Sequence, residues 1–150
     1  MRLKSVVAVT CMLLVTYAPV YSKCPGHWSA FEKNCYIFIN VHITWREALK
    51  MCRIYKGHLL EINSSSENSF TSTLLKGKNA PLWLGITDMG QQGTWVSATS
   101  GARVNYTNWG QGLPHSKPGM NCATVDGGVW KDTLCSMRLT FVCKHKMAEK

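Results

Sequence analysis

Hydrophobic and polar positions follow a helical period in two parts of the chain. Residues 44–47 and 64–67 each begin with Thr or Ser and carry Glu three positions later, which is the capping-box signature of a helix N-terminus. Apolar residues then recur at helical spacing over 45–52 and over 70–74. The pattern predicts two amphipathic helices, and Gly57 is expected to end the first.

Shorter apolar runs bounded by Gly, Asn or Ser predict strands. They cover residues 36–39, 59–62, 82–86, 94–96, 122–125 and 139–143. Residues 97–121 have almost no periodic signal and are rich in glycine and proline. A long ordered loop of this kind is uncommon unless it binds something, so the loop is the first place to expect a binding site.

Residues 1–22 have a different pattern from the rest of the chain. Arg2 and Lys4 precede the apolar run 6–15, and the segment ends in Val20-Tyr21-Ser22, as in a secretory signal. The run is shorter than the about 20 residues of a membrane span, and no second hydrophobic run follows. We expect 1–22 to be a signal peptide and 23–150 to be one secreted, extracellular domain without a membrane span.

Six cysteines lie beyond the predicted signal peptide. They are Cys24, Cys35, Cys52, Cys122, Cys135 and Cys143. An even set in a secreted chain of this size predicts three disulfides, although the count alone leaves their pairing open.

Several short motifs follow one another in a fixed order. They are Cys24-Pro25-x-x-Trp28, Cys35-Tyr36, the predicted helix 45–52, His58-Leu59, Trp83-Leu84-Gly85-Ile86, Asn105-Tyr106-x-Asn108-Trp109, Trp130-x-Asp132 and Phe141-Val142-Cys143. The ordered set resembles the C-type lectin-like domain in its long form, which has an extra N-terminal disulfide. Its sequence is most similar to secreted invertebrate members, including perlucin-like proteins of molluscs.

The resemblance implies an α+β, C-type lectin-like fold, with two helices flanking small antiparallel sheets and a long loop region. It also implies three disulfides, which pair Cys24 with Cys35, Cys52 with Cys143 and Cys122 with Cys135. Reduction of these bonds should unfold the domain, because each contributes roughly 2 to 5 kcal/mol.

Calcium-dependent members of that family place acidic or amide residues on both sides of a cis proline, here Pro114. Further oxygens come from an acid two residues before a cysteine and from an Asn-Asp pair after a Trp. The matching positions in this chain are Leu113, His115, Met120, Lys131 and Asp132. Calcium takes about six to eight oxygen ligands, and an ammonium group would repel it. We therefore expect no metal and no cofactor, with a calcium-dependent lectin that has a non-standard site as the alternative.

The other metal positions are equally poor in ligands. A second calcium position in the family keeps Asp88, but Gln92, Ser116 and Met120 replace the later carboxylates. The histidines outside the loop show no zinc-ligand spacing. Nothing in the sequence favours a different bound ion.

The charge balance favours acidic partners. The chain has 17 Lys+Arg and 8 Asp+Glu, and without Arg2 and Lys4 the formal charge is 15 − 8 = +7. Such a surplus speeds encounter with anionic glycans, microbial surfaces or anionic matrix. Nucleic acid is not expected, because the chain should be exported and its basic residues are scattered. No nucleophile elbow, phosphate loop or carboxylate pair is present, so we expect no enzyme.

Five residues are candidates for ligand contact, because the resemblance places them on or near the long-loop surface. They are Trp109, His115, Lys117, Lys131 and Asp132. An aromatic face and basic groups suit sugars or acidic surfaces without a metal, although Trp109 could equally anchor the loop. We predict a calcium-independent lectin-like binding protein for glycans or acidic surfaces. A protein partner and a structural role in extracellular or shell matrix are the alternatives.

Two asparagines begin glycosylation sequences of the form Asn-x-Ser or Asn-x-Thr. Asn63 precedes a predicted helix and is expected to be exposed. Asn105 lies in a segment that resembles a buried strand, so it is the weaker candidate.

Overall fold

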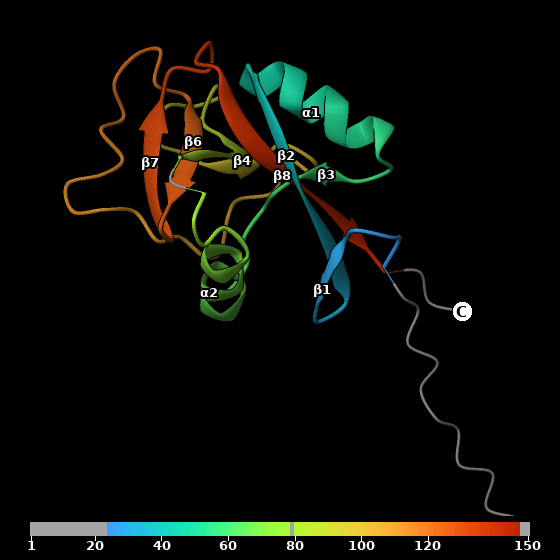
Figure 1. The fold of residues 1–150 in the computed structure, drawn as a ribbon. Helices are drawn as coiled ribbons and strands as arrows, with labels where there is room; N and C mark the ends of the chain where they lie inside the picture. Colours follow the sequence, from blue (N-terminus) through green and yellow to red (C-terminus); the bar gives the residue numbers. More distant parts are fainter. Residues whose placement is uncertain (1–23, 79, 148–150) are drawn as a thin grey trace, which may run out of the picture.

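One mixed sheet forms the centre of the domain, and helices α1 and α2 lie on opposite sides of it (Figure 1). The computed structural model describes residues 24–78 and 80–147, and the predicted signal peptide 1–22 lies outside them. The elements are β1 Ser29–Phe31, β2 Asn34–Ile43, α1 Trp45–Ile54, β3 His58–Leu59, α2 Ser65–Leu74, β4 Leu82–Thr87, β5 Val96–Ser97, β6 Cys122–Asp126, β7 Val129–Thr133 and β8 Leu139–Lys146.

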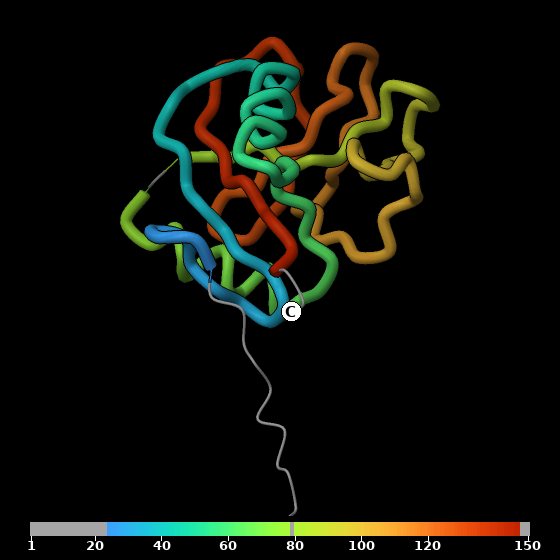
Figure 2. Tube along the Cα trace, turned by 90° about the vertical axis from the view of Figure 1, so that its right-hand side faces the viewer, coloured from blue at the N-terminus to red at the C-terminus, as the bar shows by residue number. Residues whose placement is uncertain are grey.

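The sheet has eight strands in the order β1-β2-β8-β4-β6-β7, with β3 paired to β8 and β5 paired to β4. The predicted α+β class, its two helices and its long loop are confirmed. The predicted small antiparallel sheets are joined into one, because β8 pairs antiparallel with β2 and parallel with β4. Strands β2 and β8 run side by side, which brings the two described ends of the chain together (Figure 2).

Alternating side chains of β4 and β8 divide the core into two clusters, one on each face of the sheet. Leu84 and Val142 belong to the cluster that receives Phe70 of α2. Trp83 and Phe141 belong to the other cluster, which contains the buried face of α1. Each large apolar side chain buried in this way contributes about 1.5 to 3 kcal/mol.

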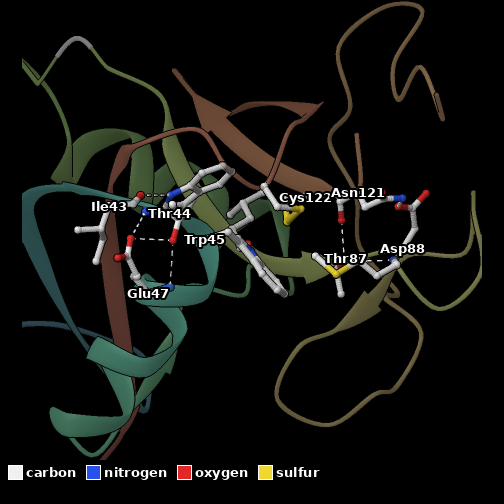
Figure 3. Close-up of a disulfide and its surroundings, with 12 residues drawn as sticks. Ile43, Thr44, Trp45, Glu47, Thr87, Asp88, Asn121 and Cys122 are labelled. Atoms are coloured by element: carbon white, nitrogen blue, oxygen red, sulfur yellow. Dashed lines mark hydrogen bonds between the residues drawn. A yellow bond between two sulfur atoms is a disulfide. The ribbon is translucent and has the colours of Figure 1, made fainter. Parts of the chain in front are cut away.

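Helix α1 begins at the predicted capping box. The Glu47 amide donates to Thr44 Oγ1 at 3.4 Å, and the Thr44 amide donates to the Glu47 carboxylate at 2.8 Å (Figure 3). The last helical residue is Ile54, and the left-handed residue that follows the helix is Lys56, one position before the predicted Gly57. Gly57 still takes part in the C-terminal cap, because its amide donates to the Cys52 carbonyl at 2.9 Å. Its lack of a side chain also allows close packing, since a Cβ there would lie 2.5 Å from the Lys144 carbonyl oxygen.

Two strands, β1 and β7, lack a sequence signal. In β7 two positions depart from the usual pattern, since Val129 is 50% exposed and the Asp132 side chain is buried, whereas Trp130 is buried and Lys131 is exposed. The predicted strand 59–62 ends at Leu59, and the segment after it stays in the core without strand pairing. The predicted strand 94–96 begins only at Val96. A segment of this domain can therefore be buried in the core without being part of a strand.

Three disulfides join distant parts of the fold, in the pairing that the resemblance implied. They are Cys24–Cys35, Cys52–Cys143 and Cys122–Cys135. The first lies beside the β1–β2 hairpin, the second links α1 to β8, and the third links the start of β6 to the segment after β7. Within the described part of the chain, none of the helices could cross a lipid bilayer.

Candidate binding site on the long loop

The long loop, residues 98–121, connects β5 to β6 and extends from the left side of the molecule in Figure 1. Trp109 holds the middle of the loop against the sheet. Its ring centroid lies 4.8 Å from that of Trp95 and 5.7 Å from that of Trp130. The Trp130 amide donates to the Asn108 carbonyl, and the Gly110 amide donates to the Trp130 carbonyl. Trp109 is half-buried, so it anchors the loop and leaves part of its ring accessible.

A buried carboxylate ties the loop to strand β7. The Asp132 side chain has no exposed surface, and its Oδ1 lies 3.0 Å from Nδ1 of His115. Its Oδ2 accepts the backbone N–H of Ser116 at 3.0 Å. The Leu113–Pro114 peptide bond just before His115 is cis. Both carboxylate oxygens therefore have a protein donor from the loop.

The environment of Asp132 lowers its pKa. Burial raises the pKa of this carboxyl, but hydrogen bonds from His115 and from the Ser116 amide outweigh burial and hold the pKa below its usual range. The folded protein therefore favours the ionised carboxylate.

Acidification should remove the stabilisation that this carboxylate provides. Because the folded pKa lies below the unfolded value of about 3.9, the stabilisation is complete above that value and disappears as the pH falls through the folded pKa. Asp132→Asn should lower the free energy of unfolding by about 1 to 3 kcal/mol at pH 7, and the gap to the parent protein should close below pH about 4. Urea unfolding of both proteins between pH 7 and pH 2.5 measures this difference in the free energy of unfolding. A gap that is constant over this range would contradict the assignment.

A second carboxylate organises the base of the loop. Asp88 is 1% exposed and accepts the Asn121 side-chain amide at 2.8 Å (Figure 3). It also accepts the Gly93 amide at 2.8 Å. The Gln92 side-chain amide donates to the Ser116 carbonyl, which joins this segment to the one that carries His115. Within residues 24–78 and 80–147, no group of three or more His, Cys, Asp or Glu side chains could hold a metal ion.

The five predicted contact residues divide into three kinds. His115 and Asp132 contact each other, and only His115 reaches the surface, with 38% of its side chain exposed. Lys117 and Lys131 are exposed, on the loop and on β7 respectively. Trp109 belongs to the tryptophan cluster described above. A ligand on this face could therefore contact four of the five side chains directly, but not Asp132.

The two predicted glycosylation sites are both at the surface. Asn63 lies just before α2, and Asn105 lies in the long loop. The expectation that Asn105 occupies a buried strand was wrong, because its segment forms no strand and its side chain is exposed. Attachment of glycans at Asn63 and Asn105 stays a prediction.

A depression of about 280 Å³ lies on the loop, and sequence analysis singled out only Trp109 and Pro114 among the side chains around it. Its lining includes Trp95, Arg103, Thr107, Trp109 and Pro114. Arg103 has no motif around it. It lines the same depression as the two tryptophans because its backbone forms an isolated bridge with Val96 at β5.

Comparison with known proteins identifies the family. Residues 41–145 match the lectin C-type domain, so the chain belongs to the C-type lectin domain family. C-type lectin domain family 10 member A of Mus musculus is 33% identical over 98% of this chain and 50% of its own length. The human CD209 antigen is 28% identical over 83% of this chain and 31% of its own length. The chain therefore spans half or less of these curated relatives.

Solved structures agree with this assignment. The carbohydrate-recognition domain of a mouse scavenger receptor C-type lectin superposes with a TM-score of 0.78 at 32% identity, and the match covers 83% of this chain and 98% of that one. Human lithostathine superposes with a TM-score of 0.76 at 29% identity, over 82% of this chain and 99% of that one. The fold is therefore that of a C-type lectin domain.

Proposed function

We propose that this protein is a secreted, calcium-independent glycan-binding domain that contacts acidic glycans or other anionic surfaces through its long-loop face. One observation carries the proposal. The single carboxylate that remains among the expected ligands of the sugar-binding calcium, that of Asp132, is buried and accepts hydrogen bonds from His115 and Ser116.

The residues at this position do not fit calcium. Leu113 and Met120 have no side-chain oxygen, and the Lys131 ammonium would repel a dication. The oxygens of Asp132 that face the loop are already taken by protein donors. These donors perform the task that an ion would otherwise have, which is to hold the loop on β7. No cofactor is proposed.

Glycan binding is supported by the family and by the charge of the loop face. One solved relative is a carbohydrate-recognition domain. The exposed charged side chains of the loop and of adjacent β7 are Arg103, Lys117 and Lys131, whereas Asp88 and Asp132 are buried. A face with this charge attracts anionic ligands and speeds encounter with them. Secretion is supported by the signal-like residues 1–22 and by the three disulfides, which persist in oxidising compartments.

Calcium should change the thermal stability very little. A site with a Kd of about 0.1 mM would add about 1.4 kcal/mol at about 1 mM calcium, which is a shift of several degrees in Tm for a domain of this size. We expect a shift within the error of differential scanning fluorimetry. Asp132→Ala is the matched control, and a calcium-dependent rise that this substitution abolishes would support the calcium-lectin alternative.

A glycan array probed once with calcium and once with a chelator tests the proposed function directly. We expect binding to acidic glycans that is equal in the two conditions. Binding that needs calcium would replace the proposal with a calcium-dependent lectin. Binding to no glycan in either condition would refute glycan recognition altogether.

A further inference from the structure

We infer that the depression between Trp95, Arg103, Trp109 and Pro114 is a subsite for one acidic pyranose, a sugar unit that carries a carboxylate or a sulfate group. The inference rests on the proposed function and names the ligand class for the same loop face. It assigns recognition to residues other than those at the positions of the family's calcium site.

The size and walls of the depression suit a single sugar ring. Its volume of about 280 Å³ lies near the lower end of the roughly 300 to 1,000 Å³ of small-molecule sites. Trp109 is held by its contacts with Trp95 and Trp130, so little conformational entropy is lost when a ligand packs against its accessible part. The apolar C–H face of a pyranose is complementary to such an aromatic surface.

Arg103 supplies an unpaired cation at the same place. Its side chain is exposed, and among the described residues no carboxylate lies within ion-pair distance of it. Its backbone is fixed by the bridge to Val96, so the guanidinium is attached to an ordered position. A guanidinium binds a carboxylate or a sulfate with two parallel hydrogen bonds, which favours an acidic sugar over a neutral one.

Trp95 supplies an independent observation. The residue is 6% exposed, and its indole Nε1 has no hydrogen-bond partner among the described residues. A buried donor without a partner is unfavourable, so a ligand that brings a hydrogen-bond acceptor to it binds more tightly. A sugar oxygen that enters the depression and shifts the surrounding side chains slightly would supply this acceptor. The indole N–H of Trp95 is therefore also a reporter of occupancy.

Titration of the folded protein with three sugars tests the subsite. The probes are methyl β-glucuronide with a carboxylate, glucose 6-sulfate with a sulfate, and methyl β-glucoside with neither, and the readout is the indole N–H signals in ¹H–¹⁵N spectra. We expect one or both acidic sugars to shift the Trp95 and Trp109 signals, with affinity at least about tenfold above that of the neutral sugar. The two acidic arms decide whether carboxylate or sulfate is preferred.

Arg103→Gln should lower the affinity for the acidic sugar at least about tenfold and leave that for the neutral sugar unchanged. Lys50→Gln is the matched control, because it removes an exposed cation of α1 that lies outside the long-loop face, and it should change affinity by less than about twofold at moderate salt. Arg103 is exposed, so its replacement should keep the parent unfolding midpoint. Trp109 is left intact because it packs against the core and holds the loop.

Unchanged affinity in Arg103→Gln, or Trp95 and Trp109 signals that do not move at saturation, would overturn the subsite. If the same protein still binds acidic glycans on the array, the proposed function stands and recognition lies elsewhere on the loop. If neither the sugars nor the array show binding, both the subsite and the proposed function fail.

Discussion

Replacement of Lys144 with Met should lower the free energy of unfolding by about 3 to 5 kcal/mol. Lys144 lies in β8 and is 4% exposed, and its Nζ lies 2.5 Å from Oε1 of the equally buried Glu67 in α2. Removal of one member of a buried ion pair leaves the other charge without compensation, which is far more costly than the loss of a surface pair.

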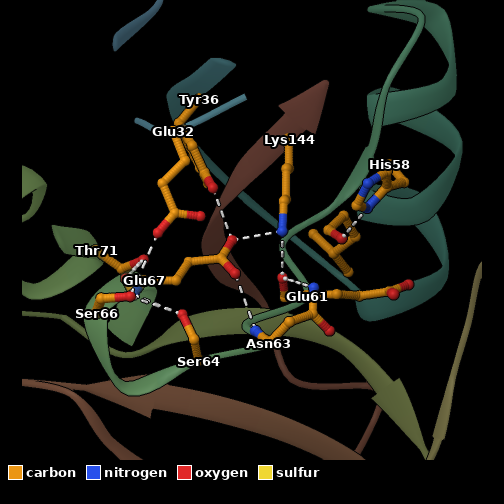
Figure 4. Close-up of polar contacts among 11 residues, drawn as sticks. Glu32, Tyr36, His58, Glu61, Asn63, Ser64, Ser66, Glu67, Thr71 and Lys144 are labelled. Carbon is orange, nitrogen blue, oxygen red and sulfur yellow. Dashed lines mark hydrogen bonds and ion pairs between the residues drawn. The ribbon is translucent and has the colours of Figure 1, made fainter. Parts of the chain in front are cut away.

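The contacts around Glu67 explain why the effect should be large (Figure 4). Oε1 also accepts the Tyr36 hydroxyl at 2.7 Å, and Oε2 accepts the Asn63 amide at 2.9 Å. Lys144 Nζ donates to the Glu61 carbonyl at 3.0 Å. The network therefore joins α2 to β2, to β8 and to the segment before α2. Burial, followed by the hydrogen bond to Glu67, raises the pKa of Tyr36 far above its usual range, so its hydroxyl stays a donor.

Chemical unfolding of three variants tests this network. Lys146→Met changes an exposed lysine of the same strand and should alter stability by less than about 0.5 kcal/mol. The double variant Glu67→Gln/Lys144→Met should be more stable than Lys144→Met alone, because no unpaired charge is then buried. A loss of less than about 1 kcal/mol in Lys144→Met would contradict a desolvated ion pair.

Removal of the Cys52–Cys143 disulfide by a double replacement with Ala should cost about 4 to 5 kcal/mol. The bond closes a segment with a sequence separation of 91 residues, and in the chain-entropy model the constraint on the unfolded chain grows with this length. Both cysteines are fully buried in the cluster that contains α1, so lost packing adds to the entropic effect.

The Cys24–Cys35 disulfide is the matched comparison, because its sequence separation is only 11 residues. Its removal should cost about 3 kcal/mol, less than the removal of the long-range bond. Denaturant unfolding of both double variants, against the parent, measures the difference. An equal or reversed order of the two losses would show that loop length does not control the stability of this domain.

Protein contacts hold the long loop at several points. Trp109 packs against two tryptophans, Asp132 receives donors from His115 and Ser116, and Asp88 receives the Asn121 side-chain amide. These contacts hold the loop at its middle and on the side of β7. The acid titration of Asp132 and the predicted insensitivity of the Tm to calcium are therefore two tests of one proposal, which is that hydrogen bonds from His115 and Ser116 hold the loop without an ion.

In helix α2 the predicted N-terminal motif is present, but Glu67 has a different role from the one predicted. The Ser64 side chain accepts the Glu67 amide at 3.1 Å, as a helix cap should. The Glu67 carboxylate does not complete the predicted capping box, because it turns into the core and pairs with Lys144. The buried face of α2 contains Glu67, Asn68 and Thr71, so it is more polar than its predicted amphipathic pattern. Partners on β2, β7 and β8 make burial of Glu67 and Asn68 favourable, whereas the Thr71 hydroxyl donates to the Glu67 carbonyl within the helix.

Local chemistry was sufficient to predict much of this protein. A hydroxyl residue followed by Glu starts a helix through contacts within four residues, and an even set of cysteines indicates disulfides wherever the strands lie. The order of short motifs indicated the family and the cysteine pairing. Leu113, Met120 and Lys131 supply no anionic oxygen at the positions that the resemblance assigned to calcium, which led to the prediction that no calcium binds.

Long-range pairing decided the rest. Strand β7 was missed because its buried position holds Asp132, and only the loop donors make that burial favourable. Arg103 meets Trp95 and Trp109 only through pairing at β5, and Glu67 meets Lys144 across a large separation in sequence. The sequence by itself indicated the family and the two helices, because these depend on residue type and local spacing. The tertiary structure decided which charges are buried and which residues share a site, because both depend on partners that are distant along the chain.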